Sequence, residues 1–148
     1  LELVKARAYA GDGSVQRALT EALDALLRAF APFLPFVTEE VWSWWQEGSV
    51  HRAAWPDSGR LRALAGASDA TPYAVAGEVL GRIRKAKTEA KLSMKAAVRR
   101  VVVTDTADRL AALRQVESDL RDAGSVGVIE FEEGGDLQVE VELEPPAA

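Results

Sequence analysis

The spacing of the apolar residues changes near Met94, and this change most constrains what the chain can fold into. Before Met94, apolar residues recur three and four positions apart, which places them on one face of an amphipathic helix. After Met94, β-branched residues cluster or alternate with polar ones in three strand-like segments: 98–103, 126–132 and 137–143. The pattern predicts a mainly α chain with an α+β appendage: a helical bundle followed by a small β-α-β-β subdomain.

Glycine and proline residues delimit the predicted elements. Helices are predicted over residues 1–10, 15–30, 35–46, 71–91 and 105–124. Ser14 and Thr71 are expected to cap two of them, and Gly134-Gly135 is expected to join the last two strands into a hairpin. Pro145-Pro146 close the chain. The predicted domains are a helical bundle over residues 1–94 and a subdomain over residues 95–148.

Between Arg82 and Arg100 the chain is strongly basic, although its overall net charge is -5. The segment holds eight cations and one carboxylate, Glu89, which gives a local charge of +7. The flanking residues 1–81 carry -3 and residues 101–148 carry -9. Such a basic island attracts a polyanion, because cations that neutralise phosphates release condensed counterions. The alternative is an ordinary solvated helix face.

Some cations of the basic island have acidic neighbours on the predicted helix. Arg82 falls beside Glu78, four positions away, and Lys85 is related to Glu89 in the same way. The others lie on the opposite flank or in the following loop without an acid beside them. These are the predicted phosphate contacts: Arg84, Lys87, Lys91 and Lys95. Arg99 and Arg100, on the next strand, are secondary candidates for RNA contact.

The four tryptophans allow two interpretations. Trp42 and Trp44 flank the apolar stripe of the 35–46 helix, where they either fill the core or stack on unpaired bases. They are therefore further secondary candidates for RNA contact. Trp45 lies within the stripe and is predicted to belong to the core. Trp55 is predicted to fill a gap between helices.

The sequence contains no recognisable catalytic or metal-binding constellation. It has no cysteine, and its single histidine, His51, has no nucleophile or carboxylate partner in the pattern. No apolar run approaches the roughly 20 residues that a membrane-spanning helix needs. We therefore expect no metal, no cofactor and no membrane as partners of this chain.

Three segments resemble the class I aminoacyl-tRNA synthetases for valine, isoleucine and leucine. The run LLRAFAPFLPFVTEEVW (26–42) resembles the C-terminal helical, anticodon-binding domain that this group shares. The runs SVHRAAWP (49–56) and RKAKTEAKLSMK (84–95) are most similar to valyl-tRNA synthetases. Isoleucyl- or leucyl-tRNA synthetases are the alternative within the group.

The resemblance implies a fragment of a cytoplasmic valine–tRNA ligase, whose other domains use ATP with Mg. This region would bind the anticodon stem and loop of tRNA and would be inactive alone, because the two ATP-site motifs and the proofreading domain are absent. Lys91-Leu92-Ser93-Met94-Lys95 resembles one of those motifs, but its residue order differs and it follows a helix. The first residue, Leu1, agrees with an excised piece whose partners are tRNA and the remainder of the synthetase.

A second function class stays open. In it, the chain is a docking module whose basic island meets an acidic surface of the parent enzyme or of another protein.

Overall fold

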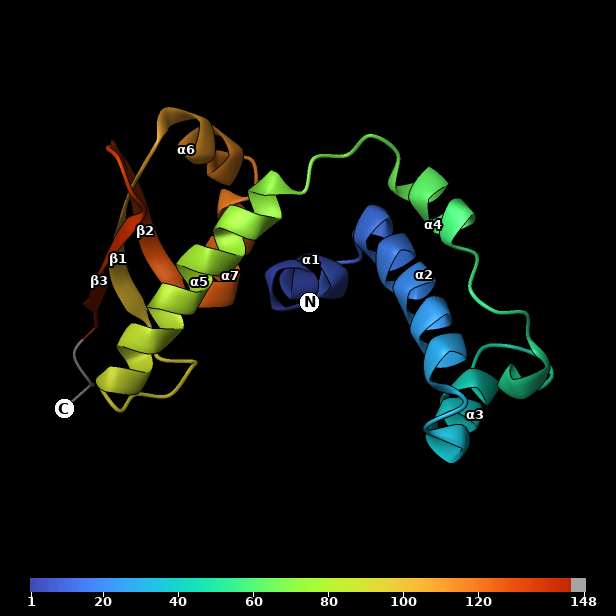
Figure 1. Cartoon of the computed structure of the whole chain (residues 1–148). Coiled ribbons are helices and arrows are strands. Elements are labelled where there is room, and N and C mark those ends of the chain that lie inside the picture. Colours follow the sequence, from blue (N-terminus) through green and yellow to red (C-terminus); the bar gives the residue numbers. More distant parts are fainter. Residues whose placement is uncertain (145–148) are drawn as a thin grey trace. The chain divides into compact units, whose positions relative to one another are not determined.

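The computed structural model describes residues 1–144, so the Pro145-Pro146 ending lies outside the described residues. Contacts divide the chain into two compact units. Unit 1 combines Leu1–Ala10 with the chain from Asp69 onward, and unit 2 comprises Gly11–Ser68. The predicted fold class is confirmed, because helices dominate and a small sheet follows near the C-terminus (Figure 1). Within residues 1–144, no helix is both long and apolar enough to cross a bilayer.

Unit 1 is built on a three-stranded sheet. Its strands are β1 (Val98–Asp105), β2 (Val126–Glu133) and β3 (Gln138–Leu143), in the order β2-β1-β3. β1 runs parallel to β2 and antiparallel to β3. The predicted order β-α-β-β is confirmed, but the predicted hairpin of the last two strands is wrong. A helical connection makes β1 and β2 parallel neighbours, and β3 then pairs with the free edge of β1.

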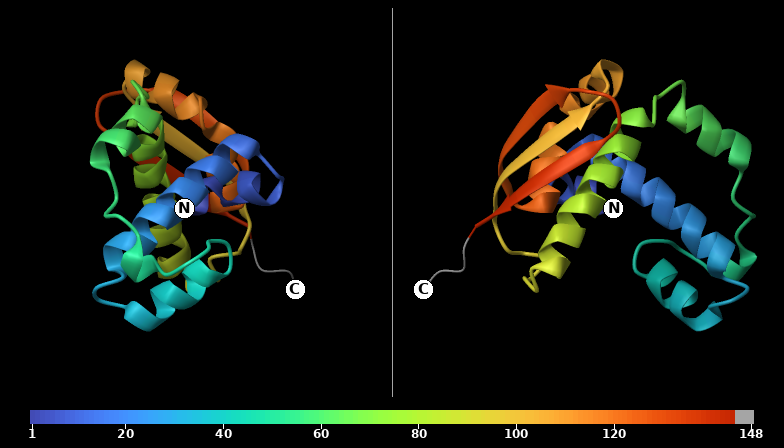
Figure 2. Two further views of the ribbon diagram at one scale, coloured as in Figure 1. Left: turned by 90° about the vertical axis from the view of Figure 1, so that its right-hand side faces the viewer. Right: turned by 60° about the vertical axis from the view of Figure 1, so that its left-hand side comes forward.

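Three helices cover one face of this sheet (Figure 2): α5 (Thr71–Glu89), α6 (Ala107–Arg114) and α7 (Glu117–Gly124). α6 and α7 replace the single predicted helix over 105–124, because Val116 (φ -124°, ψ 23°) leaves the helical conformation between them. The short elements η1 (Glu2–Val4) and α1 (Lys5–Tyr9) pack against α7.

The core of unit 1 lies between α5 and the sheet. Its fully buried side chains include Val75, Val79 and Ile83 of α5, together with Val101 and Val103 of β1. Burial of each such side chain stabilises the unit by about 1.5–3 kcal/mol. The predicted boundary at residue 94 places α5 in the helical bundle, whereas in the structure α5 shares its core with the sheet.

Unit 2 consists of helices α2 (Gly13–Phe30), α3 (Pro35–Ser43), η2 (Val50–Arg52) and α4 (Ser58–Ala65). Asp12, rather than the predicted Ser14, caps α2, because its carboxylate accepts hydrogen bonds from the backbone N–H groups of Ser14 and Val15. Its small core contains Leu27, Ala31, Trp42 and Val50.

Within the described chain, the predicted apolar stripes of unit 2 are only partly covered. In α2, Leu27 is buried while Leu26 and Phe30 are exposed. In α3, the buried face carries Thr38 and Trp42 instead of the predicted Val37 and Trp45. Trp55, predicted to fill a gap, is also exposed. Unit 2 therefore presents more apolar surface than its sequence pattern predicts.

Candidate nucleic-acid interface

The basic island lies entirely in unit 1, on the C-terminal half of α5, on the loop 90–97 and at the start of β1. The loop is a defined structure. Its backbone is held by hydrogen bonds from Leu92 N–H to the Lys87 carbonyl (2.9 Å) and from Ala96 N–H to the Ser93 carbonyl (2.9 Å). Lys91 turns the chain out of the helix, with a left-handed backbone (φ 57°). The cations of the island thus occupy fixed backbone positions.

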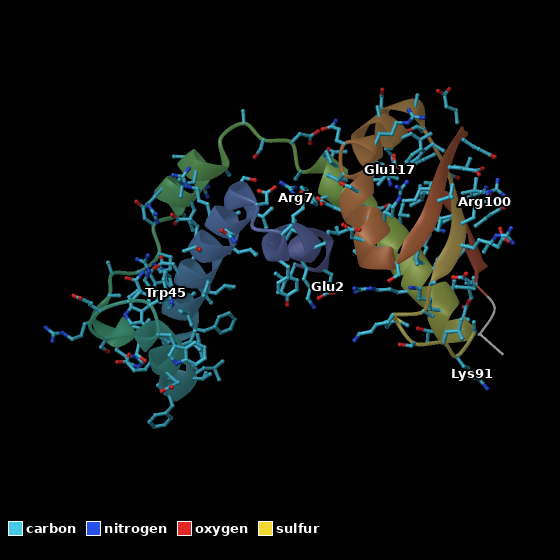
Figure 3. All side chains as sticks on the ribbon, turned by 180° about the vertical axis from the view of Figure 1, so that it is seen from behind. Glu2, Arg7, Trp45, Lys91, Arg100 and Glu117 are labelled. Carbon is cyan, nitrogen blue, oxygen red and sulfur yellow. The ribbon has the colours of Figure 1, made fainter. Side chains whose placement is uncertain are left out.

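Lys91 and Lys95 are the predicted contacts that the structure leaves most accessible. Both side chains are exposed, and among residues 1–144 no carboxylate oxygen lies within 4.0 Å of either ammonium nitrogen. Lys91 projects outward at the C-terminal end of α5 (Figure 3). These two ammonium groups can therefore meet an external anion without first breaking an ion pair.

Arg84 has an acidic neighbour that the sequence pattern does not reveal. Its guanidinium nitrogen lies 3.7 Å from a carboxylate oxygen of Glu2, on η1. The prediction that no acid lies beside it is therefore wrong, because Glu2 arrives from the other end of the chain. The pair is half exposed and its attraction is weak, so Arg84 can still reach an anion.

Lys87 occupies the interior, with 1% of its surface exposed. Its Nζ donates hydrogen bonds to the backbone carbonyls of Met94 (3.0 Å) and Gly124 (2.7 Å). Burial, together with the charge of Arg84, lowers the pKa of Lys87. The expectation that Lys87 lies on an open flank is wrong, because the buried arc of α5 extends through Ala76 and Leu80 toward Lys87.

The pairing of Arg82 also differs from the prediction. Glu78 forms its ion pair with Arg109 of α6 (2.7 Å) and not with Arg82. Arg82 is exposed, and within the described residues it has no ion pair. By contrast, the predicted pair of Lys85 with Glu89 is confirmed at 3.8 Å. Arg82 is thus an additional free cation that helix spacing alone hides.

Arg99 and Arg100 are neutralised on the sheet. Arg99 lies 3.1 Å from Glu142 of β3, and Arg100 forms a two-pronged ion pair with Glu130 of β2. The hydrogen bond from Arg100 lowers the pKa of Glu130. The guanidinium of Arg100 lies on the sheet face opposite the helices (Figure 3). These two cations are less available to RNA than Lys91 and Lys95.

Trp42 and Trp44 differ sharply in exposure. Trp42 is 7% exposed and belongs to the core of unit 2, so its ring cannot stack on a base in this conformation. Trp44 is 71% exposed, and its indole N–H donates a hydrogen bond to Glu40 (3.2 Å). One of the two secondary aromatic candidates therefore remains accessible.

A sequence model of the family described as "Anticodon-binding domain of tRNA ligase" matches residues 1–103. The chain belongs to this family.

Full-length relatives carry the same region. The valine–tRNA ligase of Thermobifida fusca (strain YX) is 52% identical over 98% of this chain and 17% of the relative. The valine–tRNA ligase of Salinispora tropica is 45% identical over 90% of the chain and 18% of the relative. That of Cutibacterium acnes is 42% identical over 99% and 18%. The chain thus spans about a sixth of the length of the relatives it matches.

The matched family region of this anticodon-binding domain ends within β1, and it includes both units and the whole basic island. In the part of the chain that the structure describes, no group of three or more His, Asp or Glu side chains could hold a metal ion. The accessible charged chemistry of the island is therefore that of isolated ammonium and guanidinium groups, which suits binding of phosphates.

Proposed function

We propose that this chain binds the anticodon stem and loop of tRNA as part of a valine–tRNA ligase. The rest of that enzyme would carry out ATP-dependent aminoacylation in the cytoplasm, with ATP and Mg bound outside this region. The family match and the valine–tRNA ligase relatives support the ligand class. The valine assignment rests on the names of those relatives.

The observation that carries the proposal is the pair of uncompensated lysines on the loop after α5. Most other cations of unit 1 have a carboxylate within 4.0 Å, whereas Lys91 and Lys95 have none among the described residues. We call Arg84, Lys91 and Lys95 the basic edge. The ammonium groups would contact phosphates, which fixes the position of the RNA without reading its bases.

The test compares two double variants that remove the same charge. Lys91→Gln/Lys95→Gln removes the two unpaired cations, and Lys85→Gln/Arg99→Gln removes two paired ones. Binding of a valine tRNA transcript is measured by fluorescence anisotropy between about 50 and 200 mM salt. We expect the first variant to bind about tenfold more weakly and to lose roughly 0.7–0.9 of salt slope per contact. The control should change affinity by less than threefold.

Unchanged affinity of the Lys91→Gln/Lys95→Gln variant would contradict the assignment of these residues. If the intact chain shows no binding to tRNA but binds an acidic protein surface, the docking function is correct instead. Circular dichroism of both variants checks that the fold survives, and it should, because all four side chains are exposed.

A further inference from the structure

Lys87 is the one member of the basic island that is buried, and it connects two segments that lie far apart in the sequence. Its Nζ bonds the Met94 carbonyl on the loop and the Gly124 carbonyl at the end of α7. Among residues 1–144, no carboxylate is paired with it. A buried ammonium held only by carbonyls is costly, since it loses its hydration without gaining an opposite charge. An apolar residue would fill this position at lower cost, unless the two bonds serve a purpose.

The position of Met94 suggests that purpose. Met94 lies between the two exposed lysines and directly precedes Lys95. The other bonds of the loop are local, such as that from Lys95 N–H to Ser93 Oγ (3.2 Å). Local bonds shape the turn but do not hold it against the rest of the unit. The bond from Lys87 to Met94 does so, because Lys87 is anchored within α5.

The second bond fixes the anchor itself. Gly124 is buried at the C-terminal end of α7, where unpaired carbonyls favour a cation. A β-carbon at Gly124 would lie only 2.9 Å from the Val126 side chain and 3.4 Å from Ile83 of α5. The junction of α5, α7 and β2 is therefore tightly packed, and Nζ has little room to move away from Gly124.

We propose that Lys87 is a positioning residue for RNA binding, which holds the loop so that Lys91 and Lys95 present their ammonium groups to the phosphate backbone. This inference rests on the proposed function, because it gives the loop geometry a ligand. Lys87 itself makes no contact with the RNA. Its effect on affinity passes entirely through the two exposed lysines.

The test is a double-mutant cycle on affinity for a valine tRNA transcript. Lys87→Met removes the ammonium and keeps a long apolar side chain, and it is made in the wild-type chain and in the Lys91→Gln/Lys95→Gln chain. We expect Lys87→Met to weaken binding about five- to tenfold in the wild-type chain and less than twofold in the chain that lacks the two lysines. Equal effects in both backgrounds would overturn the positioning role.

A second measurement uses the wild-type chain and does not depend on the variant folding. Nuclear magnetic resonance can detect the side-chain NH₃⁺ groups of lysines labelled with ¹⁵N during titration with the transcript. We expect the signals of Lys91 and Lys95 to shift, while that of Lys87 keeps its position and its slow exchange with water. A Lys87 signal that shifts as much as the other two would show direct contact and would overturn the inference.

The two hypotheses fail in different ways. If Lys91→Gln/Lys95→Gln leaves the affinity unchanged, the residue assignment of the proposed function fails, and the positioning role of Lys87 fails with it. If that double variant weakens binding but Lys87→Met does not, the proposed function stands and only the inference about Lys87 is wrong.

Discussion

Tyr73 donates a hydrogen bond of 3.0 Å to the carboxylate of Asp119, which joins the first turn of α5 to α7. Asp119 is almost fully buried, and Arg7 of α1 lies 3.4 Å from the same carboxylate oxygen. Burial and the charge of Asp119 raise the pKa of the Tyr73 hydroxyl. One buried carboxylate thus links three helices of unit 1, one of which comes from the opposite end of the chain.

Removal of that carboxylate should destabilise unit 1. Asp119→Ala leaves Tyr73 and Arg7 without this acceptor, and we expect a loss of about 2 kcal/mol in the free energy of unfolding. Tyr73→Phe, which removes only the hydroxyl, should cost about 1 kcal/mol. Urea unfolding followed by circular dichroism gives both values. Asp122→Ala, an exposed position of the same helix, is the matched control and should change stability by less than 0.5 kcal/mol, roughly the scatter of surface substitutions.

Two glycines should respond in opposite ways to alanine. At Gly124 the added methyl group would collide with Val126, and we expect Gly124→Ala to cost about 1–3 kcal/mol. At Gly77, inside α5, nothing lies within 4 Å of the added carbon, so Gly77→Ala should stabilise the helix by about 0.5–1 kcal/mol. Thermal unfolding of both variants measures the contrast. A stabilised Gly124→Ala protein would show that the junction is looser than described.

The two tryptophans of the α3 region should separate packing from RNA binding. The indole N–H of Trp42 is buried without a hydrogen-bond partner in the described chain, so Trp42→Phe should change stability by less than about 1.5 kcal/mol and leave tRNA affinity unchanged. If Trp44 stacks on a base, Trp44→Ala should weaken binding by about 1–3 kcal/mol without loss of stability. Equal affinities for Trp44→Ala and the wild type would remove Trp44 from the candidate contacts.

The pair of Arg100 and Glu130 predicts a dependence on acid. The pKa of Glu130 is lowered in the folded state, so its ionised form stabilises the fold at pH values above the ordinary value of 4.5. That contribution disappears as the pH falls through the lower, folded pKa. Glu130→Gln should therefore be less stable than wild type at neutral pH, and the difference should close below pH 4.5. Unfolding in urea at several pH values tests this, with Glu140→Gln as the control from the same sheet.

The helices and strands were predictable from local patterns, but the partners of side chains from distant segments were not. The 3- and 4-residue spacing correctly predicts α5, and the cluster of valines predicts β1. The position of Lys87 was missed because the apolar arc of α5 is wider than the single stripe around Val79, and only the packing against α7 shows this. Residues Ala76, Leu80 and Ile83 lead to Lys87 at helical spacing, and this was the available signal.

The candidate site shows the same division. Lys91 and Lys95 were predictable as unpaired because their sequence neighbours are uncharged or basic. The ion pair of Arg84 with Glu2 joins residues 82 positions apart, and no periodicity of a single helix reveals it. The order of the strands depended on the same kind of information. The choice of β1 over β2 as the partner of β3 is made by the apolar residues that face α5, and a turn pattern at Gly134-Gly135 does not contain it.

The discontinuity of unit 1 has a consequence for synthesis on the ribosome. Unit 2 is one continuous segment and can acquire its contacts as soon as Ser68 has left the exit tunnel. The first ten residues must wait, because α7, their packing partner, is translated more than a hundred residues later. The nascent chain therefore assembles its middle before its beginning, and the central strand of the sheet acquires its second neighbour only when β3 emerges.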